Sequence, residues 1–135
     1  MALIQWNDSF SVNVAEIDRQ HQQLIGMIND LNDAMRQGQG KAVMGKIING
    51  LVNYATTHFI TEEKYFDKFG YPEAISHTKE HTDFVIKVSV FKNEFEKGNI
   101  ALPLQIMDFL NDWLENHIKG ADKKFGPFFN EKGLK

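Results

Sequence analysis

The chain has 135 residues, which is enough for one domain with a buried core, and 42% of them are hydrophobic. Its net charge is −3 with acidic and basic residues interspersed, so its charge does not favour nucleic-acid binding. No apolar run approaches the ~18 residues of a membrane span, and residues 1–6 lack the features of a signal peptide, so we expect a cytoplasmic protein. Without cysteine, any bound metal must use histidine and oxygen ligands.

Four amphipathic helices are predicted from apolar residues that recur every three or four positions. An arm at residues 1–17 precedes them, and Asn13 with Glu16, or alternatively Asp18, is expected to cap the first helix. Glycine and proline punctuate the rest, with Gly120 ending the last helix. This pattern predicts an all-α, antiparallel up-and-down four-helix bundle, forming one domain. Its helices lie roughly at 18–37, 41–69, 72–97 and 103–119, followed by an irregular but packed tail at 120–135.

All five histidines fall on the inward faces of these helices, and every helix supplies at least one. A single histidine on an apolar face is usually an ordinary core residue, with roughly one chance in ten of being a ligand. Five of them beside Glu62 are different, because each buried polar group without a partner costs ~1–3 kcal/mol. A metal centre would satisfy them together. The five are His21, His58, His77, His81 and His117.

The spacing of the polar side chains decides which of them can share a helix face. His58 and Glu62 are four residues apart, as are His77 and His81, so each pair projects from one face. Asp122 follows His117 by five residues, which places it about 140° away in a regular helix. It can join the site only if the helix loosens near Gly120. From spacing alone, Asp122 is therefore predicted to be a surface carboxylate.

Taken together, these residues resemble the ligand signature of the hemerythrin family, and in particular its bacterial members. The resemblance spans nearly the whole chain. It departs from the common pattern where Asn13 replaces a frequent glycine and Phe66 a frequent methionine. The motifs are His21, His58-x-x-x-Glu62, His77-x-x-x-His81 and His117-x-x-x-x-Asp122, with flanking matches at Trp6, Ile17-Asp18, Phe59, Glu63, Tyr71-Pro72, Trp113-Leu114, Ile118 and Gly126-Pro127.

The resemblance implies two iron ions with a bridging oxo or hydroxo group. His77, His81 and His117 would hold one iron, His21 and His58 the other, and Glu62 and Asp122 would bridge them. Five histidines, two bridging carboxylates and one bridging oxygen leave a single open position on two octahedral irons. In the family, dioxygen binds end-on at that position, held as a hydroperoxide. By the same resemblance Phe59, Leu114 and Ile118 line an apolar pocket over it; core packing is their ordinary role, and both can be true.

These features predict an oxygen carrier with no catalytic residues rather than an enzyme. Di-iron oxidases and oxygenases typically use Glu-x-x-His motifs, which this sequence lacks, and no histidine is spare as a general base. A module that senses oxygen or nitric oxide through a protein partner is an alternative, and an oxygen-consuming protein is a further candidate partner. A zinc or manganese site is also consistent with the ligand set, because ligand types discriminate metals poorly.

Overall fold

The computed structural model describes residues 4–135, and this part of the chain contains helices and no strand. The first three residues of the predicted arm lie outside the described range. The helices are α1 (Ala15–Arg36), α2 (Gly40–Tyr54), α3 (Ile60–Phe69), α4 (Ala74–Glu96), α5 (Leu102–Trp113) and α6 (Lys123–Glu131). Two π-helical segments, η1 (Ala55–Phe59) and η2 (Leu114–Asp122), join α2 to α3 and α5 to α6.

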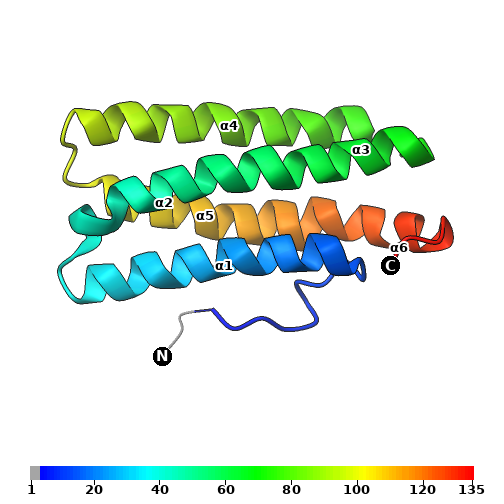
Figure 1. Cartoon of the computed structure of the whole chain (residues 1–135), viewed down its shortest axis with the longest axis horizontal. Helices are drawn as coiled ribbons and strands as arrows, with labels where there is room; N and C mark the ends of the chain where they lie inside the picture. The colour runs from blue at the N-terminus through cyan, green and yellow to red at the C-terminus, as the bar shows by residue number, and fades with distance from the viewer. Residues whose placement is uncertain (1–3) are drawn as a thin grey trace.

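These elements form four long rods in an antiparallel bundle (Figure 1). The first rod, α1, packs against α2 and α5, and α4 packs against the same two helices from the opposite corner. Turns at alternate ends connect successive rods, so the chain runs up and down (Figure 1). The predicted fold class is therefore confirmed.

The N-terminal arm runs beside α1 and leads into it without a side-chain cap (Figure 1). Val14 is the N-cap residue, and neither Asn13 nor Asp18 caps the helix as expected. Instead the Asp18 carboxylate accepts hydrogen bonds from the Val12 backbone N–H and the Ser11 hydroxyl. Asn13 has a φ of 59°, in the left-handed region that glycine and asparagine tolerate best.

The predicted irregular tail is wrong, because the last rod continues as helix through η2 and α6 to Glu131. Gly120 does not end the helix, since its φ is not in the left-handed region that a terminating glycine adopts. Helix α6 packs closely on the arm: a Cβ at Gly126 would lie 2.6 Å from the Val12 carbonyl oxygen. This contact fixes the end of the rod that carries Asp122.

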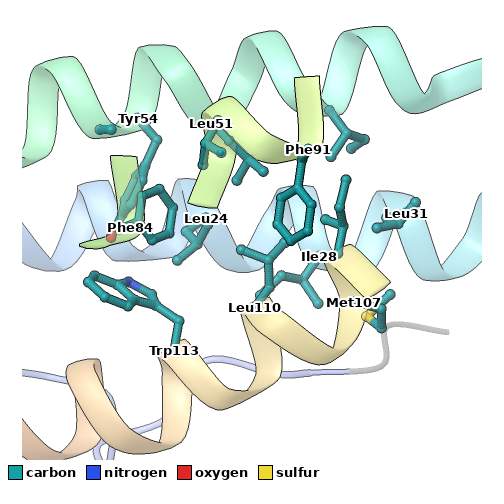
Figure 2. Close-up of a cluster of buried hydrophobic side chains, with 14 of the residues drawn as sticks. Leu24, Ile28, Leu31, Leu51, Tyr54, Phe84, Phe91, Met107, Leu110 and Trp113 are labelled. Carbon is teal, nitrogen blue, oxygen red and sulfur yellow. The ribbon is translucent and has the colours of Figure 1, made fainter. Parts of the chain in front are cut away.

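Two apolar clusters fill the bundle on either side of a polar layer. The larger cluster includes Leu24, Leu51, Phe84 and Leu110, and Figure 2 shows how side chains from four helices interdigitate there. The smaller cluster joins the arm, α3 and α6 through Val12, Val14, Ile17, Phe66, Tyr71, Phe125 and Phe129. Phe66 packs edge-on against His77 and so closes one side of the polar layer.

Candidate metal centre

The polar layer contains all seven side chains predicted as metal ligands. Each is at least 97% buried, and together they are the buried polar or charged residues found within residues 4–135. They come from every rod: His21 from α1, His58 and Glu62 from η1 and α3, His77 and His81 from α4, and His117 and Asp122 from η2. Their ligand atoms fall into two overlapping groups that each fit one metal ion.

Asp122 reaches this layer because the helix widens after Trp113. A π-helix bonds residue i to residue i+5, so two residues five apart return to nearly the same face. The Nε2 atom of His117 lies 3.1 Å from Oδ1 of Asp122, whose side chain is 0% exposed. The surface position predicted from spacing alone is therefore wrong. The loosening that Asp122 needed is present, and it extends over Leu114–Asp122.

The two carboxylates each face both groups of histidines, with one oxygen toward each group. In Glu62, Oε1 lies 3.0 Å from Nε2 of His81, and Oε2 lies 2.7 Å from Nε2 of His58. In Asp122, Oδ1 lies 2.8 Å from Nε2 of His77, whereas Oδ2 lies 2.9 Å from Nε2 of His21. One side of the layer thus has three histidines and the other side two, and both share the same pair of carboxylates.

Several of these inward atoms are close together without forming hydrogen bonds. Five atoms have a nitrogen or oxygen neighbour within 3.1 Å, yet they have no hydrogen-bond partner among the described residues. Lone pairs that converge on shared centres, rather than on one another, produce this pattern, and buried polar atoms without partners point to an ion. The residues present therefore fit a pair of metal ions. The five atoms are His81 Nε2, His117 Nε2, Glu62 Oε2, Asp122 Oδ1 and Asp122 Oδ2.

In the metal-free layer, the buried carboxylates raise the pKa of most of the histidines, and the histidines lower the pKa of the carboxylates. Burial lowers the pKa of His21, His77 and His117, but the carboxylates of Asp122 and Glu62 outweigh burial and raise these pKa values to about 9, 9 and 10. Burial lowers the pKa of His58, and the charge of Glu62 only partly opposes this shift. Conversely, neighbouring histidines hold the pKa of Glu62 and Asp122 below the usual range, although burial acts to raise them. Metal ions would replace these shared protons.

On the side away from the centre, three histidines have partners at Nδ1 that the sequence does not predict. His58 contacts Gln20 Oε1 at 2.7 Å, His81 contacts Glu63 Oε2 at 3.0 Å, and His117 contacts Glu80 Oε1 at 3.0 Å. Such contacts fix which ring nitrogen faces the centre. Gln20 and Glu80 act across the bundle on histidines of other rods, so no local pattern signals them. For Glu63 the sequence predicts only a flanking match to the family.

Aromatic rings of the larger apolar cluster stack on the same three histidines. Phe59 stacks on His81 with ring centroids 3.9 Å apart, and Trp113 stacks on His117 at 3.8 Å. Tyr54 lies nearly parallel to His58 at 4.9 Å. The three residues predicted to line the oxygen pocket, Phe59, Leu114 and Ile118, are all buried within this cluster.

The comparisons with known proteins agree with this geometry. The profile of the Hemerythrin HHE cation binding domain matches residues 12–129. Bacteriohemerythrin from Methylococcus capsulatus is 34% identical over 94% of this chain and 97% of its own length. The corresponding protein of Stenotrophomonas maltophilia is 35% identical over 93% of this chain and 80% of its own length.

A further relative and a solved structure extend the match. Myohemerythrin from Theromyzon tessulatum is 31% identical over 90% of this chain and 89% of its own length. A crystal structure of wild-type hemerythrin superimposes with a TM-score of 0.83 at 33% identity, covering 93% of this chain and 97% of that one. The chain therefore belongs to the hemerythrin family, with a buried histidine and carboxylate cluster suited to two metal ions. Within residues 4–135, no helix is long and apolar enough to cross a membrane.

Proposed function

We propose that the chain binds dioxygen reversibly at a pair of iron ions, as a store or carrier rather than an enzyme. His77, His81 and His117 would hold one ion, His21 and His58 the other, and Glu62 and Asp122 would bridge the two. The iron pair supplies the electrons and the coordination position for dioxygen. The protein supplies a dry, closed surrounding that slows the entry of protons and water.

The unequal division of the ligands is the observation that carries this proposal. Five side chains converge on one side and four on the other, with both carboxylates counted on each side. A shared bridging oxygen would complete six positions on the three-histidine side and five on the two-histidine side. The open position would then belong to the ion held by His21 and His58, which would leave room for one small ligand but not for a co-substrate as well.

Metal analysis combined with an absorption spectrum tests the proposal. Protein produced with ample iron should contain two irons per chain, and reduced protein should change spectrum when air is admitted and recover when oxygen is removed. Repeated cycles without loss support a carrier. Steady consumption of oxygen with a reductant and an organic substrate would instead identify an oxygenase, and one zinc ion per chain would reject the iron pair altogether.

A further inference from the structure

Two buried polar groups beside the candidate metal centre are not used by its ligands. The side chains of Tyr54 and Trp113 are only 4% and 8% exposed. The Trp113 indole nitrogen lies close enough to the Tyr54 hydroxyl to act on its pKa, but neither atom has a hydrogen-bond partner of good geometry among residues 4–135. A buried polar atom without a well-formed hydrogen bond lowers stability, so we expect neither group to stabilise the metal-free fold more than a phenylalanine ring would.

Both groups lie at the same edge of the centre, next to the predicted oxygen pocket. The Tyr54 ring stacks on His58 of the two-histidine side and lies 5.8 Å from Phe59. The Trp113 ring stacks on His117 and also lies 5.8 Å from Phe59. Figure 2 shows the Tyr54 hydroxyl and the Trp113 nitrogen on the facing edges of their rings, with Phe84 beside them. These two polar atoms therefore lie beside Phe59, one of the apolar residues predicted to line the pocket.

We infer that the Tyr54 hydroxyl donates a hydrogen bond to the small ligand bound on the two-histidine side, and that Trp113 donates to the Tyr54 oxygen. This inference rests on the proposed function. An indole N–H only donates, whereas a phenol both donates and accepts, so the direction of the two bonds is fixed. A donor chain of this kind favours ligands that accept hydrogen bonds and carry negative charge, because such bonds are stronger than neutral ones and polarise one another.

Replacing Tyr54 by phenylalanine removes the hydroxyl and keeps the ring on His58. The matched control is Tyr71→Phe, since Tyr71 is also buried but its hydroxyl donates to Glu73 at 3.2 Å. In metal-free protein, Tyr54→Phe should melt at the same temperature as the wild type or higher, whereas Tyr71→Phe should melt lower. A drop for Tyr54→Phe as large as that of the control would give the hydroxyl a structural role and overturn the inference.

Azide, a linear anion that accepts hydrogen bonds, probes the iron-loaded protein. Its affinity, followed by the visible absorption of the iron pair, should fall about tenfold in Tyr54→Phe and stay unchanged in Tyr71→Phe. Trp113→Phe, which keeps a ring over His117, should cause a smaller loss that does not add to that of Tyr54→Phe. Unchanged azide affinity in Tyr54→Phe overturns the inference, and fully additive losses overturn the role of Trp113.

The same samples separate this inference from the proposed function. Wild-type protein that loads two irons and binds azide but does not bind oxygen reversibly would reject the carrier, while the azide comparison would still decide the role of Tyr54. If the wild-type protein cycles with oxygen but the wild type and Tyr54→Phe bind azide equally well, only the role of Tyr54 is rejected. A chain that holds no iron rejects both.

Discussion

The two sides of the candidate metal centre differ in the groups that stand behind their histidines. On the three-histidine side, Glu63 and Glu80 place carboxylate oxygens 3.0 Å from Nδ1 of His81 and His117. On the two-histidine side, the neutral amide of Gln20 contacts His58, and Nδ1 of His21 has no partner among residues 4–135. A carboxylate makes an imidazole a stronger ligand as well as orienting it, whereas an amide mainly orients it.

The two sides also differ in their number of histidines, three against two, so the surrounding residues and the ligands are unequal in the same direction. The side with more histidines also has two of them beside carboxylates, which suits it to hold its ion more firmly. The side with fewer histidines has weaker support, and in the proposed function it is the side that would bind the small ligand. On that proposal, holding the centre together and admitting a small ligand are roles of different halves of one site.

The largest expected effect comes from Glu62→Gln, which removes a charge shared by both sides. The metal-free protein should lose about 3–5 kcal/mol of unfolding free energy, because protonated histidines are left without their buried partner. Iron content should fall below two per chain, since an amide is a poor bridging ligand. Elemental analysis and denaturant unfolding measure both effects.

Glu63→Gln is the control for that change, because Glu63 is adjacent in sequence, is 39% exposed at its side chain and supports only His81. It should keep two irons and most of the stability. If Glu63→Gln lost as much iron as Glu62→Gln, the layer would not be divided as the geometry suggests.

Leu114→Ala tests whether the pocket protects the open position on the two-histidine side. As a large-to-small change in a buried cluster, it should cost ~2–5 kcal/mol of stability. It should also admit water and speed the oxidation of oxygenated protein to the inactive diferric form. Leu51→Ala, in the same cluster and equally buried, supplies the matched loss of packing. Equal oxidation rates in the two variants, after correction for stability, would leave Leu114 with a packing role alone.

The unfolding free energy of the metal-free protein should depend on pH through the protons bound to the histidines on both sides of the centre. The pKa values of His21, His77 and His117 are raised to about 9, 9 and 10, so the folded state binds more protons than the unfolded state above pH 6.5. Their contribution is complete below pH 6.5 and is lost as pH rises toward 9 or 10, at up to about 1.4 kcal/mol per pH unit for each group. Iron affinity should change oppositely, rising with pH, because the ligands must be deprotonated. Thermal melts from pH 6 to 9, with and without iron, would show opposite trends, and parallel trends would contradict the proton count.

The sequence predicted the fold class because four clean apolar stripes, broken by glycine and proline, leave few other arrangements. It identified the candidate ligands because five histidines on inward faces have no ordinary explanation. It misjudged the tail, because Gly120 reads as a helix stop and the contact that draws α6 onto the arm is not local. The position of Asp122 followed from the family resemblance but not from spacing, because a π-helical turn leaves no periodic signal.

The partners of the histidines were the least predictable part of the site. Gln20 and His58 are separated by 38 residues, and Glu80 and His117 by 37. Each pair meets only after the rods have packed. A glutamine or glutamate on a half-exposed helix face looks like any solvated residue, so the difference between the two sides became visible only in the structure.

The smallest expected effect is also the most direct test of that difference, an exchange of the supporting groups. Glu80→Gln should weaken the ion on the three-histidine side about tenfold, in the lower part of the range for such outer contacts. Gln20→Glu should strengthen the ion on the two-histidine side, because His58 gains a carboxylate partner. The fold should be little affected by Glu80→Gln, since the Glu80 side chain is 43% exposed.

Stepwise iron(II) titration with two resolved affinities would measure each side. The double variant is decisive: if the supporting groups set the inequality, the two affinities should move closer together, whereas affinities that stay apart would assign the inequality to the number of histidines alone.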